Sequence, residues 1–477
     1  MSVSYKRSIC WVRRDLRLFD HTALAEATYR SHEVFVVFVF DPTILDLLED
    51  RAHLRVSFIH RSLQEMDRKL REQGSRLWVL LGNPATVIPQ FAKEIQAEAV
   101  FASRDYEPFA RRRDLTVQEN LKLAGIEFLD FKDQITFDPH ELATAEGNPF
   151  RVFTPFRKAW EKLFIADRDA AEAVSDLNKL ARDDESIDYP MPSLKDLGFQ
   201  EVELWLEPGE DAGRKRLANF ASKLADYKAK RDFPALDQTS TLSVDFRFGT
   251  VSIREAIRLT LEHPSEGADS WRSELIWREF YQHILFHYPD VVDQTFQPQY
   301  RDIEYPGSKE DFEAWSEGRT GFPIVDAAMR CLNATGWMHN RLRMVVASFL
   351  TKDLLVDYRW GEAYFQRKLL DFDLASNNGG WQWSASTGAD PQPYFRIFNP
   401  ISQSAKFDSE GNFIRRWVPE LADLEAPSIY FPALAAEFDL LTASVELGKT
   451  YPHPIVDHAI QRDRAIALLS KKPITES

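Results

Sequence analysis

The stretch from Asp371 to Trp383, DFDLASNNGGWQW, places two acids, two asparagines, two glycines and two tryptophans within thirteen residues. Carboxylates and carboxamides can form hydrogen bonds with a heterocycle, and glycines let the backbone approach a flat ring closely. Trp381 and Trp383 alternate, so in a locally extended segment they would point to opposite sides. The composition predicts a pocket wall in which one tryptophan faces a cofactor and the other faces a substrate.

A second constellation lies in the segment WRSELIWREFYQHILFHYP, which begins at Trp271. At helical spacing Trp271, Glu274 and Arg278 fall on one stripe. Trp277 lies beside Glu274 on the same face. One interpretation is an ion pair between Glu274 and Arg278 above an aromatic core stripe. The other is a face that binds a planar aromatic ligand carrying phosphates, and both remain open at this point.

Two further segments carry polar side chains at informative spacings. In TGWMHNRLRM, a helix predicted to follow Gly336 places Asn340 and Met344 one turn apart between two arginines, at the mouth of a pocket for an anion. The run TSTLS at 239–243 precedes a predicted helix or turn, and its hydroxyls and amides would donate hydrogen bonds to a phosphate. The alternatives are ordinary packing for the first segment and helix capping for the second.

The elements that must position these residues differ between the two halves of the chain. Five runs rich in β-branched and aromatic residues alternate with helical patterns near the N-terminus: SICWV, EVFVVFVF, RLWVLL, EAVFAS and IEFLDF. They predict an α/β domain over residues 1–135 with a five-stranded parallel, doubly wound sheet. The pattern G-x-G-x-x-G does not occur there, which argues against dinucleotide binding of the nicotinamide type.

The second half is predicted to be all-α. An acidic, proline-punctuated segment centred on ARDDESIDYPMPSLKDLG indicates an interdomain connector over residues 136–206. After it the periodicity is helical, and Leu217, Leu224 and Tyr227 fall on one stripe of the first predicted helix. Residues 207–477 are therefore expected to form a helical domain.

The composition excludes several classes of protein. A net charge of −15 argues against nucleic-acid binding over the whole surface but leaves room for a local basic face. No apolar run approaches the roughly 20 residues of a membrane span, and the first residues lack the apolar segment of a secretory signal. Cys10 and Cys331 provide neither a disulfide framework nor a metal-ligand spacing. We therefore expect a cytoplasmic protein with no metal and no membrane partner.

Several motifs together resemble the photolyase/cryptochrome family: WREF, GRTGFPIVDAAMR, TGWMHNRLRM, and NNGGWQW followed by FRIFNP. The opening WVRRDLRLFDHTAL is similar to the first strand and helix of that family, so the resemblance covers essentially the whole chain. Within the family the chain most resembles the bacterial class I enzymes that split cyclobutane pyrimidine dimers in DNA. The resemblance implies an α/β antenna domain, a connector, and a helical domain that binds FAD and DNA.

The resemblance also implies an activity and its residues. The activity is that of a carbon–carbon lyase in which reduced, anionic FAD donates an electron to the dimer under light. Carried over by position, the FAD-binding residues are Tyr227, Thr239, Ser240, Thr241, Leu242, Ser243, Trp271, Arg278, Arg343, Asp371, Phe372, Asp373 and Asn377. The catalytic residues around the flipped dimer and the flavin are Glu274, Trp277, Asn340, Met344, Asn377 and Trp383. The residues placed to contact DNA are Arg341, Arg396, Gln403 and Lys406.

The chain departs from the family pattern at the electron relay. Relatives pass electrons to the flavin through three tryptophans. Here Trp381 keeps the first position, whereas Tyr358 and Tyr305 occupy the second and third. Tyrosine is harder to oxidise without losing its proton, so the nearby Trp360 is the candidate substitute. The alternative is that Trp360 only packs and the protein photoreduces poorly.

The antenna site is a second departure. Folate-binding relatives carry a lysine where this chain has Asp293. The antenna residues are instead similar to those of deazaflavin-binding relatives: Arg55, Asp105, Glu107 and Arg247. The resemblance favours a deazaflavin, with methenyltetrahydrofolate or no antenna chromophore as the alternatives.

Other functions fit the sequence less well. A cryptochrome-type blue-light receptor without repair is disfavoured because the dimer-pocket residues are present and few residues follow the helical pattern at 459–469. A flavoprotein oxidoreductase would need a nicotinamide site, for which we find no glycine-rich loop. Relatives that repair the (6-4) product carry a histidine pair where this chain has His339 and Asn340. We expect a monomer whose partner is dimer-containing DNA.

Overall fold

The structure is a computed structural model that describes residues 5–184 and 186–470. The residues after 470, on which the expected absence of a signalling tail depends, lie outside the described part. The chain divides into two compact units. The first, called here the sheet unit, comprises residues 1–150, 154–225 and 240–287. The second, called the helical unit, comprises residues 151–153, 226–239 and 288–477.

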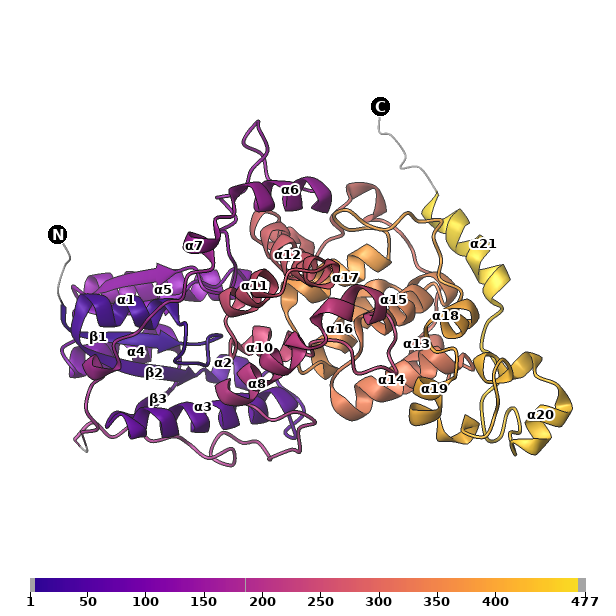
Figure 1. Cartoon of the computed structure of the whole chain (residues 1–477), viewed down its shortest axis with the longest axis horizontal. Helices are drawn as coiled ribbons and strands as arrows, with labels where there is room; N and C mark the ends of the chain where they lie inside the picture. Colours follow the sequence, from indigo (N-terminus) through magenta and orange to yellow (C-terminus); the bar gives the residue numbers. More distant parts are fainter. Residues whose placement is uncertain (1–4, 185, 471–477) are drawn as a thin grey trace. The chain divides into compact units, whose positions relative to one another are not determined.

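A parallel sheet of five strands forms the centre of the sheet unit (Figure 1). The strands are β1 (Tyr5–Val12), β2 (Ser31–Phe40), β3 (Leu77–Leu81), β4 (Ala99–Ser103) and β5 (Glu127–Phe131). Their order across the sheet is β3-β2-β1-β4-β5, and every neighbouring pair is parallel. Ile9, Val37 and Val100 are fully buried, as expected for a parallel sheet covered on both faces. The five strands and the doubly wound fold predicted from the sequence are confirmed.

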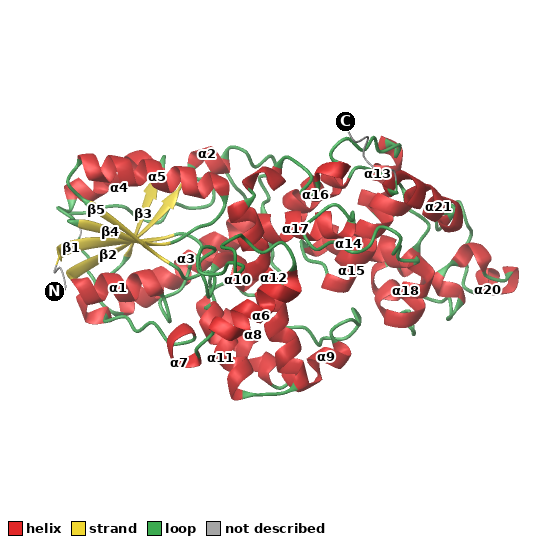
Figure 2. Ribbon diagram, turned by 90° about the horizontal axis from the view of Figure 1, so that it is seen from above, coloured by secondary structure: helices red, strands yellow, loops and turns green. Residues whose placement is uncertain are grey.

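Helices cover both faces of this sheet. Helix α1 (Thr22–Arg30) lies on one face, and α4 (Pro84–Glu94) and α5 (Pro108–Leu123) pack together on the other (Figure 2). The remaining helices of the sheet unit are α2 (Pro42–Leu45), α3 (Leu54–Glu72), α6 (Phe153–Leu163), α7 (Ala166–Asp169), α8 (Glu210–Ala221), α10 (Ser243–Phe248), α11 (Ile253–Glu262) and α12 (Glu266–His287). The sheet unit therefore includes helices from well beyond the predicted α/β segment.

The helix predicted to carry Leu217 and Tyr227 on one stripe is interrupted. Helix α8 ends at Ala221, a 3₁₀ turn follows at Leu224–Asp226, and α9 (Tyr227–Lys230) begins directly afterwards. The interruption coincides with a close approach of the start of α12, because a Cβ on Gly267 would lie 1.9 Å from the carbonyl oxygen of Leu224. Leu217 and Leu224 are nevertheless both buried. The apolar stripe was right, and the single continuous helix was wrong.

The helical unit contains no strand among its described residues. Besides α9, its helices are α13 (Lys309–Glu317), α14 (Pro323–Thr335), α15 (Asn340–Ser348), α16 (Tyr358–Lys368), α17 (Leu374–Ser384), α18 (Pro400–Phe407), α19 (Asn412–Trp417), α20 (Glu437–Thr442) and α21 (His458–Leu469). Helix α14 packs against α13, α15 and α19 (Figure 1). Its apolar side chains are buried in one large core that also holds Trp315 and Trp381. The predicted all-α character is confirmed.

Candidate active site

Helix α12 of the sheet unit carries the first set of predicted site residues. Trp271 is buried and packs against Phe220, with ring centroids 4.8 Å apart. Glu274 and Trp277 are partly exposed. Arg278 donates hydrogen bonds to the carbonyl oxygens of Gln134 (2.5 Å) and Phe246 (3.3 Å). Trp271 therefore belongs to the aromatic core, whereas a ligand-binding role of Glu274 and Trp277 stays a prediction.

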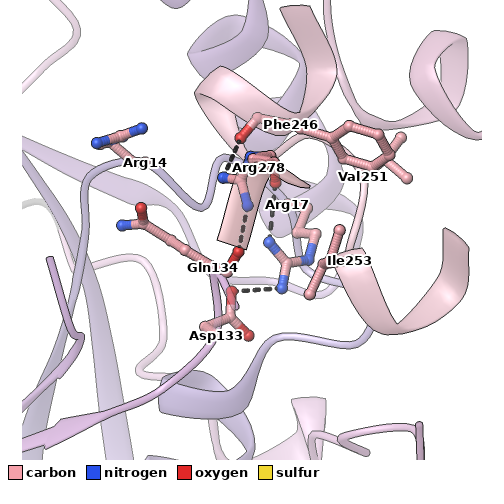
Figure 3. A pocket seen from close by; sticks show the side chains of 9 residues that line it. Arg14, Arg17, Asp133, Gln134, Phe246, Val251, Ile253 and Arg278 are labelled. Carbon is pink, nitrogen blue, oxygen red and sulfur yellow. Dashed lines mark hydrogen bonds and ion pairs between the residues drawn. The ribbon is translucent and has the colours of Figure 1, made fainter. Parts of the chain in front are cut away.

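Arg278 also lines a pocket within the sheet unit (Figure 3). The other lining residues are Arg14, Arg17, Asp133, Gln134, Phe246, Gly249, Val251 and Ile253. Arg17 forms an ion pair with Asp133 (2.5 Å) and donates to the carbonyl oxygen of Gly249 (3.0 Å). A Cβ on Gly249 would lie 2.0 Å from the carbonyl oxygen of Arg14, so only glycine lets the end of α10 approach this backbone. The pocket is a polar junction whose hydrogen bonds hold Arg278 in place.

The hydroxyl run at 239–243 leads into α10, as predicted. Thr241 has a left-handed backbone (φ 53°), and its hydroxyl donates to the carbonyl oxygen of Ser240 (2.7 Å). Leu242 is fully buried and anchors the turn. Ser240 and Thr241 are partly exposed, and Ser243 is exposed. The segment is a tight turn that presents several hydroxyls at the surface of its unit.

In the helical unit, Arg343 and Asp371 form the best-defined polar pair. Nη2 of Arg343 lies 2.7 Å from Oδ2 of Asp371, and its Nε donates to the carbonyl oxygen of Met338 (2.8 Å). The second carboxylate oxygen of Asp371, Oδ1, is buried and accepts no hydrogen bond from the residues that the structure describes. A buried polar atom without a partner costs about 1–3 kcal/mol. This oxygen therefore fits a hydrogen-bond donor on a bound group.

Helix α17 contains the stretch with two asparagines, two glycines and two tryptophans. The expectation of a locally extended segment is wrong, because Asp373 caps a helix by accepting a hydrogen bond from the Ser376 amide (3.0 Å). Burial of one face outweighs the weak helix propensity of the glycines. A Cβ on Gly380 would meet no atom within 4 Å, so open space lies beside the helix there. The side of α17 at Gly380 therefore leaves room for a bound group.

The two tryptophans of α17 still point in different directions. Residues two apart on a helix are separated by about 200°. Trp381 is buried against the ring of Phe365 at 5.0 Å, whereas Trp383 is partly exposed. Asn377 donates from Nδ2 to the carbonyl oxygen of Glu362 (3.1 Å), which fixes the carboxamide. Burial raises the pKa of Glu362 to about 7.

Helix α15 begins at Asn340 rather than directly after Gly336. Gly336 ends α14 with φ 68°, and Trp337 therefore precedes the helix. His339 caps α15, its Nδ1 accepting from the Arg341 amide (3.1 Å), and burial lowers the pKa of His339 to about 4. Asn340 is exposed and Met344 is partly exposed, one helical turn apart, as the sequence predicted.

The basic residues assigned to DNA contact are partly brought together. Arg341 lies over the ring of Phe407 at 4.5 Å, and Nζ of Lys406 lies 5.0 Å from the same ring. Arg341 is also paired with Asp232 at 2.9 Å. Arg396 is exposed, and Gln403 is partly exposed on α18. Arg341 and Lys406 therefore form one small cationic group around Phe407.

The relay residues lie in very different environments. Tyr358 is buried at the start of α16, and its hydroxyl lies 3.3 Å from Oγ1 of Thr295. Burial raises the pKa of Tyr305 and, likewise, the pKa of Tyr358. Trp360 lies in the first turn of the same helix and is 42% exposed.

The four antenna residues carried over by position lie in one cluster of the sheet unit. Arg247 pairs with Glu107 at 3.2 Å. Burial, reinforced by the positive charge of Arg247, lowers the pKa of Arg55 to about 10. Arg14 pairs with Glu107 (2.7 Å) and approaches Asp105 (3.5 Å). Sequence reasoning missed Arg14, although its place in WVRRDLRLFD, directly after the first strand, offered a signal.

Across residues 5–184 and 186–470, no group of three or more His, Cys, Asp or Glu side chains could hold a metal ion. Over the same residues, no helix combines the length and the apolar character required to cross a membrane.

Comparisons with known proteins agree with this architecture. The family described as DNA photolyase matches residues 8–175, and the family described as FAD binding domain of DNA photolyase matches residues 271–471. A deoxyribodipyrimidine photo-lyase of Synechococcus sp. is 41% identical over 97% of this chain and 96% of its own length.

Solved structures give the same result. A bacterial class III photolyase from Agrobacterium tumefaciens has a TM-score of 0.89 and 36% identity, covering 98% of both chains. A cryptochrome of Synechocystis sp. PCC6803 has a TM-score of 0.86 and 29% identity, covering 98% of this chain and 100% of its own. From its sheet, its helical FAD-binding segment and its nearly full-length relatives, we conclude that the chain belongs to the DNA photolyase family.

Proposed function

We propose that the protein is a deoxyribodipyrimidine photo-lyase, which repairs cyclobutane pyrimidine dimers in DNA under light. The observation that carries the proposal is the match, along nearly the whole chain, to relatives that bear this name. Bound FAD would supply the light-driven donation of one electron. The chain itself must hold the cofactor, admit the flipped dimer and bind the surrounding DNA.

On the flavin side, we propose that Arg343 provides the positive charge that stabilises a reduced, anionic ring. The free oxygen of Asp371 would accept a hydrogen bond from a ring nitrogen. Asn377, whose carboxamide is held by Glu362, would contact the flavin near N5. Arg278, with the hydroxyls of 239–243, would bind the phosphates. The other cofactor contacts follow the positions carried over above.

On the dimer side, we propose that the carboxyl group of Glu274 forms a hydrogen bond with a pyrimidine carbonyl. Negative charge develops on that carbonyl when the dimer accepts an electron, so the hydrogen bond strengthens as the reaction proceeds. We propose that Trp277 and Trp383 each offer a flat face to an extruded base, and that Asn340 and Met344 also contact the dimer. Enzymes that act on bases commonly extrude them from the duplex in this way.

For DNA, we propose that Arg341, Lys406 and Arg396 contact phosphates around the flipped dimer. The group around Phe407 supports this proposal because two cations lie against one ring. Arg341 already pairs with Asp232, so a phosphate must compete with that carboxylate. Gln403 would act as an additional polar contact. A small cationic surface formed by Arg341, Lys406 and Arg396 is compatible with a net charge of −15 for the whole chain.

Several finer points belong to the same proposal. Residues 1–135 would form the antenna domain, 136–206 the connector, and 207–477 the domain for FAD and DNA. The antenna would be a deazaflavin held by the cluster of Arg55, Glu107 and Arg247, with methenyltetrahydrofolate as the alternative. We further propose a class I enzyme that works as a cytoplasmic monomer. The class III photolyase from Agrobacterium tumefaciens represents the competing class.

The proposal is tested with reduced protein and an oligonucleotide that contains a thymine dimer. We expect dimers to disappear under blue light and to persist in the dark. Dimers that persist in the light would instead favour a cryptochrome-type receptor. The absorption spectrum of the purified protein, followed by chromatography of the released chromophores, would identify FAD and distinguish a deazaflavin from a folate.

A further inference from the structure

The helical unit contains a continuous row of aromatic rings that leads from Trp381 to the surface. The ring of Trp381 lies 6.0 Å from that of Trp315, measured between centroids. Trp315 lies 5.8 Å from Phe312, and Phe312 lies 5.5 Å from Trp360. Trp381 and Trp315 are buried, at 2% and 0% exposed, whereas Trp360 at the end of the row is 42% exposed. The row therefore connects a buried tryptophan to solvent.

Tyr358 occupies the position at which relatives carry the second tryptophan of the relay, but it lies outside this row of rings. Within the described residues, no ring contact joins Tyr358 to Trp381. Trp381 instead contacts the ring of Trp315, which is itself an oxidisable tryptophan. A Cβ on Gly361 would lie 2.1 Å from Cη2 of Trp381, so this glycine lets the start of α16, which carries Trp360, approach the core.

The indole Nε1–H groups of Trp381, Trp315 and Trp360 lie in different environments, which determines whether each ring can lose a proton after oxidation. Nε1 of Trp315 donates to the carbonyl oxygen of Val346 (3.0 Å), and Nε1 of Trp381 is buried without a partner among the described residues. Neither nitrogen faces a base, so an oxidised ring at either position keeps its proton and remains a strong oxidant. Trp360 is partly exposed to water and can lose its proton after oxidation. Loss of that proton would keep the radical on Trp360, at the surface.

We infer that Trp315 is the second member of the electron relay and that it connects Trp381 to Trp360 across the ring of Phe312. This inference rests on the flavin site proposed above. Trp381 loses one electron to the light-excited oxidised flavin, and Trp315 then restores Trp381 with one electron. Trp360 restores Trp315 and releases its Nε1 proton to water. An external thiol returns one electron to Trp360 and releases its own proton to water, which leaves a thiyl radical. Trp360 regains a proton from water, and Phe312 is never oxidised.

Tyr364 is the other aromatic exit from Trp315. Its ring lies 5.8 Å from Trp315 and 6.1 Å from Phe312. Its hydroxyl donates to Oδ1 of Asn333 (2.5 Å) and to the carbonyl oxygen of Ser316 (3.1 Å). Neither oxygen is a base that would take a proton from an oxidised tyrosine. The exit through Trp360 is therefore favoured.

The test follows tryptophan oxidation in protein loaded with oxidised FAD, in the presence of a thiol. We compare wild type with W315F and W360F, and use W205F as the matched control because Trp205 is 41% exposed and lies outside the helical unit. Blue-light flavin reduction is measured with transient absorption of the tryptophan radicals. The Val346 carbonyl in W315F still accepts a hydrogen bond from the Phe349 amide, so this change leaves no orphaned carbonyl.

In W315F we expect rapid charge recombination and loss of flavin photoreduction. In W360F the first oxidation should survive, whereas the long-lived deprotonated radical should disappear. W205F should resemble wild type. Wild-type behaviour of W315F, or loss of photoreduction in Y358F but not in W315F, would overturn the inference.

Two additional measurements keep the outcomes separate. If W315F does not fold, W360F decides, because an unchanged radical lifetime in W360F also contradicts the inference. Repair by chemically prereduced wild-type protein tests the proposed function independently of the relay. A protein that photoreduces through Trp315 but never repairs dimers would retain the relay and lose the proposed function.

Discussion

Two buried acids, Asp133 of the sheet unit and Asp371 of the helical unit, differ in how completely their oxygens are paired. In the sheet unit, buried Asp133 pairs with both Arg17 (2.5 Å) and Arg254 (3.0 Å). In the helical unit, Asp371 pairs with Arg343 through one oxygen, and its other oxygen has no hydrogen-bond partner among the described residues. Native proteins rarely leave buried polar atoms unpaired. Asp133 therefore belongs to a network that stabilises the fold, whereas Asp371 keeps one oxygen that could accept a hydrogen bond from the proposed cofactor.

The same two regions differ in how they titrate. Burial opposes ionisation of Asp133, but the charges of Arg17 and Arg254 hold its pKa well below its usual range. In the helical unit, burial raises the pKa of Glu362 to about 7, and the hydrogen bond from Asn378 only partly opposes this. Asp133 and Glu362 should therefore contribute to the pH dependence of stability with opposite signs.

The largest effect is expected for D133A, which tests whether the ion pairs of Asp133 with Arg17 and Arg254 stabilise the fold. Removing one partner of a buried ion pair leaves uncompensated charge and costs roughly 3–5 kcal/mol of unfolding free energy. Thermal or urea unfolding measures the loss. Because the pKa of Asp133 is depressed, its stabilisation is present above the unfolded value of about 3.9 and is lost as pH falls below it. A variant as stable as wild type would contradict the structural role.

The next largest effect is expected for D371N, which tests whether Asp371 contributes to flavin binding and not only to folding. The change weakens the ion pair with Arg343 and replaces one acceptor oxygen, so we expect flavin affinity to fall by on the order of 3 kcal/mol, or about a hundredfold. The flavin content of the purified protein and titration of the apoprotein measure this. The control is E420Q, which alters another pair of the helical unit, Arg330–Glu420 at 2.8 Å. Equal flavin content in D371N and wild type would contradict the assignment of Asp371.

A pH-dependent effect of comparable size is expected for E362Q. The folded pKa of about 7 exceeds the ordinary value of 4.5, so the native state holds the proton more tightly. Stability from this group is present below pH 4.5 and is lost as pH rises towards 7, by up to about 3 kcal/mol at 1.36 kcal/mol per pKa unit. E362Q should flatten this decline, measured by unfolding between pH 4.5 and 8. N378A removes a donor to the carboxylate and should steepen it.

The smallest effect on stability, with a clear effect on function, is expected for E274A. Glu274 is a partly exposed acid of the sheet unit, so its loss should change the unfolding free energy by less than about 0.5 kcal/mol. Its proposed hydrogen bond strengthens on the charged dimer, so repair yield should fall by at least about tenfold with little change in dimer binding. Repair per absorbed photon and dimer affinity are measured separately. Weaker binding at unchanged yield would mean that Glu274 only positions the dimer.

Local patterns were enough to predict much of the fold. The five strands were predicted because each is a short β-branched run flanked by turn residues. Helix α12 was predicted because its aromatic and charged residues recur at helical spacing. Predictions from short stretches of sequence failed where contacts with distant segments determined the backbone. Asp371–Trp383 includes most of a helix despite its glycines, and the helix predicted from Leu217 to Tyr227 is interrupted where Gly267 lets another backbone approach.

The sequence by itself determined the family, the order of strands and helices, and the residue types available to the proposed site. It did so because periodicity and motif spacing are local properties of the chain. Only the tertiary structure decided that Arg14 joins Glu107, that Asp371 keeps an oxygen free, and that Trp315 lies against Trp381. Periodicity shows which face of an element is buried, but the partner it meets there depends on how distant segments pack.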